Sequence, residues 1–148
     1  MRLEPLFRSA MRYGEPPLRI EPFGGREGAA YGTGEGRVDG ERLAGTVRWS
    51  NWPRRRNDGV WIPNITGVID TDDGAGVLFS FAGGYSVVEE TRGCRHQGIV
   101  CPATFLTEDE GYGWLNCLFA VVEGIIDMET GEILWQAYQC LPEVPGGR

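Results

Sequence analysis

The only histidine of this sequence lies between two cysteines, in the segment GCRHQGIVC at residues 93–101. Cysteine and histidine bind zinc, form nucleophile–base pairs or transfer protons. A structural zinc site needs four ligands, often in closely spaced pairs, and the sequence has neither a CxxC pair nor a second histidine. Asp70, Asp72 and Asp73 could form a carboxylate site, but DTDDG is also a typical turn sequence. We therefore expect no metal.

A covalent mechanism would need Cys94 or Cys101 in contact with His96 and a third group that orients the imidazole. Residues two apart in a strand share a face but stand about 7 Å apart, too far for a hydrogen bond. Free cysteines are usually small buried hydrophobic residues. We interpret residues 93–101 as a glycine-bounded connection between two strands that could cover a barrel mouth.

General acid–base chemistry is the better hypothesis if this chain is an enzyme. His96 is the side chain that ordinarily titrates near neutral pH. Burial of Glu123 in an apolar interior would favour its neutral form and make it a proton donor or acceptor. Tyr85 and Tyr138 could donate hydrogen bonds to a carbonyl or a developing enolate. We assign catalysis to Glu123, His96 and Tyr138, with solvent exposure or ordinary buried hydrogen bonding as the alternative for each.

Two hairpins must position these residues. Residues 59–84 predict a hairpin that turns at Asp73-Gly74, a preferred type I′ pair. Both of its faces are largely apolar, which a closed barrel explains because one face looks inward. By the two-residue period of a strand, the inward face should carry Asn64, Thr66, Val68, Phe79, Phe81 and Tyr85.

The second hairpin, residues 118–140, turns near Glu129-Thr130. Glu123 then faces Gln136, and Val121 faces Tyr138. The opposite face is apolar and includes Val122, Ile133, Trp135 and Ala137. We expect the polar face to line the barrel lumen, and Trp135 to pack outside the barrel or at a subunit contact.

These inward faces combine aromatic rings with a few polar groups, a pocket that suits a flat, largely apolar ligand. Asn116 lies near the end of residues 106–118, where we expect a short helical turn, and could cap that turn or reach the barrel mouth. The predicted ligand-binding residues are Asn64, Thr66, Phe79, Phe81, Tyr85, Tyr31, Asn116 and Gln136.

Composition narrows the classes of function. The 148 residues include 23 glycines and 9 prolines, too many for a helical bundle and typical of a single β-rich domain over residues 1–148. The net charge of −7 argues against general binding to nucleic acid or anionic membranes. The run Arg54–Arg56 reads as a solvated loop, and no glycine cluster matches a nucleotide-binding motif. Neither a signal sequence nor a membrane-spanning run is evident, so we expect a cytoplasmic protein with reduced cysteines.

Four segments, in order, carry a resemblance to a known family: LEPLF (3–7), GRVDGERLAGTV (36–47), DTDDGAGVLF (70–79) and ATFLTEDEGYGWLN (103–116). The chain resembles a family of bacterial domains of unknown function, similar to the small antiparallel barrels of allene oxide cyclase. The resemblance implies a β-barrel with an interior pocket, often in a homo-oligomer, and it carries no firm activity. Asn64 and Thr66 stand where the family often has an aspartate and an arginine, so the relatives' chemistry is not assumed.

The sequence therefore predicts an all-β, small antiparallel barrel with at most one short helical turn. Our leading hypothesis is a cofactor-independent lyase, isomerase or cyclase that acts on a small aromatic or polyketide-like molecule in the lumen. The alternatives are a ligand-binding barrel without chemistry and an oligomeric scaffold whose aromatic residues are only core.

Overall fold

The computed structural model describes residues 1–91 and 94–144, with residues 89–91 and 94 as backbone alone. Strands dominate it, and one short 3₁₀ helix precedes the last hairpin. The elements are β1 (Arg2–Tyr13), β2 (Leu18–Ile20), β3 (Gly28–Asp39), β4 (Ala44–Asn51), β5 (Arg54–Arg55), β6 (Trp61–Ile62), β7 (Asn64–Thr71), β8 (Gly76–Ala82), β9 (Tyr85–Thr91), β10 (Cys94–Leu106), η1 (Gly113–Cys117), β11 (Ala120–Asp127) and β12 (Glu132–Leu141).

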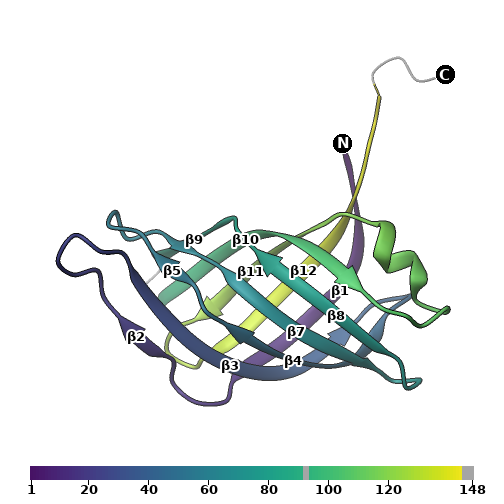
Figure 1. Cartoon of the computed structure of the whole chain (residues 1–148), viewed down its shortest axis with the longest axis horizontal. Coiled ribbons are helices and arrows are strands. Elements are labelled where there is room, and N and C mark those ends of the chain that lie inside the picture. The colour runs from purple at the N-terminus through teal and green to yellow at the C-terminus, as the bar shows by residue number, and fades with distance from the viewer. Residues whose placement is uncertain (92–93, 145–148) are drawn as a thin grey trace.

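Eight antiparallel strands close into a barrel in the order β1-β12-β11-β10-β8-β7-β4-β3, and β3 pairs back onto β1 (Figure 1). The predicted fold class is confirmed. No helix in the described part of the chain is long and apolar enough to cross a membrane.

The barrel wall forks at β10. Residues Thr104–Leu106 pair with β8, whereas Cys94–Val100 pair with β9. Beyond β9 the strand pairing continues with β6, then with β5, and then with β3. These short strands extend the barrel wall at one end. The segment that contains His96 is therefore part of a strand, and its interpretation as a connection is wrong. Its alternation explains this, because Ile99 and Cys101 are buried on either side of the exposed Val100.

Aromatic rings cross the barrel interior above glycines on neighbouring strands. Trp49 pairs with Gly34 on β3, and also with Gly67 on β7. Phe79 lies opposite Gly67 on its other side. A Cβ at Gly67 would stand 2.7 Å from Phe79 Cζ, so only glycine leaves room for the ring. The glycines that suggested turns thus also serve the core.

Trp135 repeats this arrangement against Gly124 on β11. Its ring lies 5.3 Å from Phe81 and 6.4 Å from Trp49, centroid to centroid. The prediction that Trp135 packs outside the barrel is therefore wrong. The register of the second hairpin is confirmed, with Glu123 opposite Gln136, but its two faces are reversed. The continuous apolar face fills the interior, which buries more apolar surface than the mixed face would.

The first hairpin has a different register from the predicted one. Its turn is longer than two residues, because the Thr71 hydroxyl holds the Ala75 amide at 2.8 Å and also bonds Asp73. Gly74 takes the left-handed conformation within this turn, at φ 96°. The longer turn shifts the pairing by one residue and places Ile65 opposite Phe81. Asn64 and Thr66 consequently point outward, contrary to the prediction, and both are exposed.

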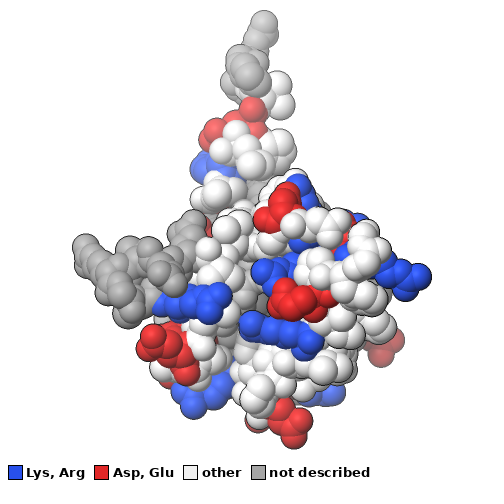
Figure 2. Space-filling view, turned by 90° about the vertical axis from the view of Figure 1, so that its left-hand side faces the viewer, with Lys and Arg blue, Asp and Glu red and all other residues white. Residues whose placement is uncertain are grey.

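The arginines of residues 54–56 are paired with acids. Arg54 lies against Glu27, Arg55 against Glu21 and Arg56 against Asp58. Figure 2 shows basic and acidic groups intermixed on this end of the molecule, where β2 and β5 lie. This intermixing fits the predicted solvated segment better than a phosphate-binding patch.

Replacing Gly67 by alanine tests the aromatic packing. The added methyl group would collide with the Arg48 carbonyl oxygen and with the Phe79 ring, so we expect G67A to lower the free energy of unfolding by about 1–3 kcal/mol. Gly76→Ala is the control, because a Cβ there meets open space and its effect should stay within about 0.5 kcal/mol. Urea unfolding measures both, and equal effects would contradict this account of the core.

Candidate functional site

The barrel interior is a packed core. Phe79 and Phe81 face inward as predicted, and their ring centroids are 4.6 Å apart. With Trp135 and Met11 they fill the interior so closely that no space remains for a water molecule among them. A ligand pocket in the lumen is therefore contradicted, because the aromatic side chains occupy the space that a ligand would need.

Several predicted ligand-binding residues lie apart from one another. Tyr31 is exposed on β3 and packs edge-on against Trp52, at 6.4 Å between centroids. Asn116, in η1, accepts a hydrogen bond from the Thr107 amide and donates one to the Thr107 carbonyl. Asn116 therefore fastens η1 to the end of β10, and it does not reach a mouth. Thr66 lies on the outer wall beside Leu78 and Arg48.

His96 is half-buried on β10, where it pairs with Asp127 on β11 and with Glu89 on β9. The carboxyl of Asp127 accepts hydrogen bonds from the Thr130 and Glu129 amides, and these bonds lower its pKa. The charge of His96 is a smaller cause of the same shift. His96 on β10 therefore lies beside the turn of the second hairpin, away from Tyr138.

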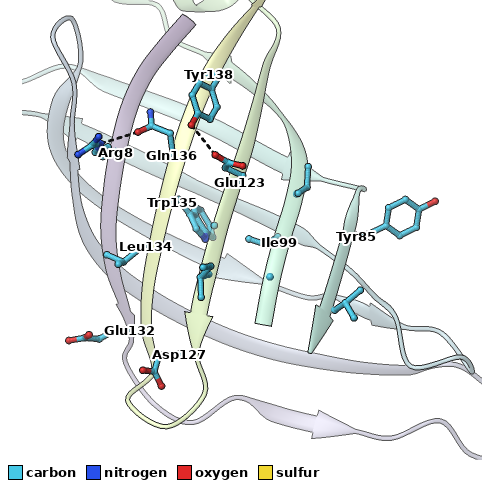
Figure 3. A pocket seen from close by; sticks show the side chains of 15 residues that line it. Arg8, Tyr85, Ile99, Glu123, Asp127, Glu132, Leu134, Trp135, Gln136 and Tyr138 are labelled. Carbon is cyan, nitrogen blue, oxygen red and sulfur yellow. Dashed lines mark hydrogen bonds between the residues drawn. The ribbon is translucent and has the colours of Figure 1, made fainter. Parts of the chain in front are cut away.

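The remaining predicted residues meet on the outside of the barrel. A groove of about 1050 Å³ crosses the outer faces of β9, β10, β11, β12 and β1 (Figure 3). It brings together Glu123, Gln136, Tyr138 and Tyr85, four of the residues chosen from the sequence. The expectation that they line the lumen is wrong, but their grouping is present on the opposite side of the sheet.

Two cross-strand rows build the groove. The first row is polar and runs Tyr85, Val100, Glu123, Gln136, Arg8. The second row is apolar and runs Val87, Gly98, Ile125, Leu134, Ala10. Leu134 is 64% exposed and Ile125 52%, although aliphatic side chains of this size are usually covered.

Gly98 gives the groove its floor. It faces outward between Val87 and Ile125, and a Cβ at this position would meet open space. The wall is therefore one side chain lower there than on either side. The sequence pattern gave no signal for Gly98 or Arg8, because their places depend on β9 and β1 joining this sheet.

The polar row is fixed by hydrogen bonds, and Figure 3 shows those of Tyr138 with Glu123 and of Arg8 with Gln136 as dashed lines. Tyr138 donates its hydroxyl to Glu123 Oε1 at 2.9 Å. Gln136 Nε2 donates to the carbonyls of Phe7 and Ala137, both at 2.9 Å. Gln136 Oε1 in turn accepts from Arg8 Nε at 3.1 Å. An acid, a phenol and a guanidinium are thus held side by side above an apolar strip.

The hydrogen bond to Glu123 raises the pKa of Tyr138, and desolvation adds to this shift. The nearby positive charge of Arg8 acts in the opposite direction and lowers it. The phenol therefore stays protonated and available as a donor over the whole neutral range. Its bond to Glu123 supports the fold below the pH at which an unfolded tyrosine ionises, about 10, and is lost as the pH rises through the raised value.

The three aspartates that could form a metal site do not converge on one point. Asp70, Asp72 and Asp73 turn to separate partners, namely Arg48, Arg37 and the Thr71 and Tyr112 hydroxyls. No group of three or more potential metal ligands occurs in the part of the chain that the structure describes.

Burial raises the pKa of the Cys101 thiol to about 12, which keeps it in the unreactive thiol form at neutral pH. Cys101 faces the core, whereas the side chain of Cys94, the other cysteine that flanks His96, lies outside the described residues.

Substitutions around Tyr138 test this electrostatic arrangement. E123Q should lower the pKa of Tyr138 toward its ordinary value, because the accepting carboxylate is removed. R8Q should raise it further, because the opposing positive charge is lost. Arg12→Gln, on the same strand but paired with Glu132, should leave it unchanged. Tyrosine ¹³Cζ shifts followed through an alkaline titration measure all three, and the same value in E123Q and the parent protein would refute the assignment.

Solved structures share this fold over nearly the whole chain. A β-barrel-like protein, ABAYE2633 from Acinetobacter baumannii AYE, is 19% identical with a TM-score of 0.80, over 93% of this chain and 94% of that one. A protein with unknown function from Clostridium acetobutylicum ATCC 824 is 19% identical with a TM-score of 0.80, over 95% of this chain and 100% of that one. An enzyme from Penicillium herquei is 23% identical with a TM-score of 0.69, over 93% and 92%.

These likenesses establish the fold, and no curated protein matches the chain. At the level of sequence, residues 1–140 match the family described as "Protein of unknown function (DUF3237)". The match covers all of the strands apart from Leu141, the last residue of β12. The resemblance inferred from the four ordered segments is confirmed, and the chain belongs to the DUF3237 family.

Proposed function

We propose that the outer groove binds a small, largely apolar molecule, and that Glu123 and Tyr138 transfer a proton to and from it. The observation that carries this proposal is the hydrogen-bonded Glu123–Tyr138 pair directly above an exposed aliphatic strip. An aromatic or polyketide-like molecule suits that strip, because its flat face covers Ile125 and Leu134 while its polar edge meets the acid and the phenol.

The chemistry follows from the roles of the two groups. Glu123 removes a proton from a carbon next to a carbonyl, and the electron pair moves to the carbonyl oxygen as an enolate. Tyr138 turns its hydroxyl from Glu123 to that oxygen, and Glu123 returns the proton to the same or another carbon. Return of the proton to another carbon is an isomerisation. In an elimination the enolate instead expels a β-substituent, which takes the proton from Glu123, and in a cyclisation the enolate carbon attacks a second carbonyl of the same molecule, whose oxygen takes that proton; none of the three needs a cofactor. The Penicillium herquei protein, which is called an enzyme, agrees with a catalytic role on this fold.

The alternative is that the same surface binds without catalysis. The apolar row, from Val87 to Leu134, also suits contact with a second copy of the chain in a homo-oligomer. A ligand-binding barrel or an oligomeric scaffold would need the exposed aliphatic residues but would have no use for the Glu123 carboxylate. Catalysis and binding can therefore be separated by substitution.

A model ketone tests the proposal. In D₂O, 2-tetralone should exchange the protons next to its carbonyl for deuterium faster with the protein than in buffer, as followed by ¹H NMR. E123Q should lose this acceleration by about 100-fold or more, because it removes the base. E129Q, in the turn after β11, is the matched control and should retain it.

Binding is read separately from the methyl resonances of Ile125 and Leu134. Gly98→Leu should abolish their response to 2-tetralone, because the new side chain fills the groove floor without disturbing the core. Shifted methyl groups without exchange would support the non-catalytic alternative. Methyl groups that do not respond in the parent protein would refute the proposed function.

A further inference from the structure

Arg8 lies at the end of the polar row, and the way in which it is held leaves one side of its guanidinium open. Its Nε donates to Gln136 Oε1, and within the described residues no carboxylate forms an ion pair with it. Arg12, four residues along the same strand, is by contrast paired with Glu132 at 2.8 Å. The two terminal nitrogens of Arg8 therefore remain available, in the forked geometry that matches a carboxylate.

Gln136 makes this arrangement rigid. Its amide nitrogen is bound by the carbonyls of Phe7 and Ala137, so its oxygen is fixed toward Arg8. The Phe7 carbonyl lies at an irregularity of the ladder, where the pairing of β1 with β12 shifts between Pro5 and Phe7. The bulge thus lets a backbone oxygen hold a side chain, which in turn orients the guanidinium. A preoriented fork loses less conformational entropy when it binds than a free arginine would.

We propose that the natural ligand of the groove is an apolar carboxylic acid, whose carboxylate is bound end-on by Arg8. This inference rests on the proposed function and adds the class of ligand. With the carboxylate at Arg8, the body of the molecule lies over Leu134 and Ile125, the outward pair next to Gln136 and Glu123 on β12 and β11. Figure 3 shows Leu134 below Arg8 and Gln136.

The spacing of the row also defines where the reacting atom lies. Arg8 and Glu123 flank Gln136 on the two neighbouring strands, so their backbones are about 10 Å apart. The acidic C–H of the ligand is therefore separated from its carboxylate by roughly the width of a ring system. The opposite end of the groove carries Asp127, whose negative charge would repel a carboxylate and so favour this orientation, beside Glu132, which Arg12 already pairs.

Two isosteric probes test this inference: naphthalene-2-carboxylate and its neutral analogue, naphthalene-2-carboxamide. Dissociation constants come from titrating the Ile125 and Leu134 methyl resonances. We expect the carboxylate to bind about tenfold more tightly than the carboxamide, the gain of a charge-assisted hydrogen-bonded pair at an exposed site. Added salt should weaken the carboxylate alone, because screening acts on the charge.

Substitution of Arg8 then assigns the effect. R8Q should remove the preference for the carboxylate and leave the affinity for the carboxamide unchanged. Arg48→Gln, with an equal loss of charge on β4 and outside the groove, should leave both affinities as they were. This control separates local recognition by Arg8 from a change in the net charge of the protein.

The outcomes distinguish this inference from the proposed function. If both probes bind equally to the parent protein, or if R8Q weakens both alike, carboxylate recognition by Arg8 is refuted while ligand binding in the groove stands. If neither probe shifts the two methyl resonances, the groove does not bind such molecules, and both proposals fall.

Discussion

The barrel depends on aromatic rings that lie across glycines of the adjacent strands. Trp49, Phe79 and Trp135 each pair with a glycine, so large side chains fill a narrow interior without pushing the strands apart. This packing outweighs a local cost, since Ser9 Oγ and the indole nitrogens of Trp49 and Trp135 are buried without hydrogen-bond partners among the described residues. Each such group costs about 1–3 kcal/mol, comparable to what burying one aromatic side chain returns. The interior is therefore committed to stability, and chemistry has to be sought on the outer wall.

Sequence periodicity predicted the strands and the all-β barrel, because alternation and turn residues are local signals. It also gave the register of the second hairpin, but it could not decide which face turned inward. Glu123, Val121 and Ile125 make a face that suits a lumen as well as an exposed groove, and only the closure of the other strands settles the choice. The first hairpin was shifted by one residue because Thr71 bonds Ala75 through its side chain, an interaction that a turn propensity does not contain.

The sequence therefore predicted only part of the candidate site. Glu123, Gln136 and Tyr138 could be grouped from the sequence because they lie on one hairpin. Arg8 joins them from β1, more than a hundred residues earlier in the chain, where it lies opposite Gln136. His96 and Asn116 had been included for their chemistry, and the structure gives them other neighbours. An outer groove differs from a lumen because a ligand in it would stay in contact with water on one side. Such a site gains selectivity from fixed polar groups at its edges more than from enclosure.

Closure of the ring between its first and last strands also affects how this chain is made. β1 is made before the other strands of the barrel, yet its partner β12 is made after them, as the pairing of Arg2 with Leu141 shows. Throughout synthesis the inward residues of β1, Phe7 and Met11 among them, lack the wall that later covers them. Pairing between such distant segments is slow, and apolar strands that wait for it are prone to aggregate. The barrel can therefore close only once β12 has been made, and until then closure competes with the association of incomplete barrels.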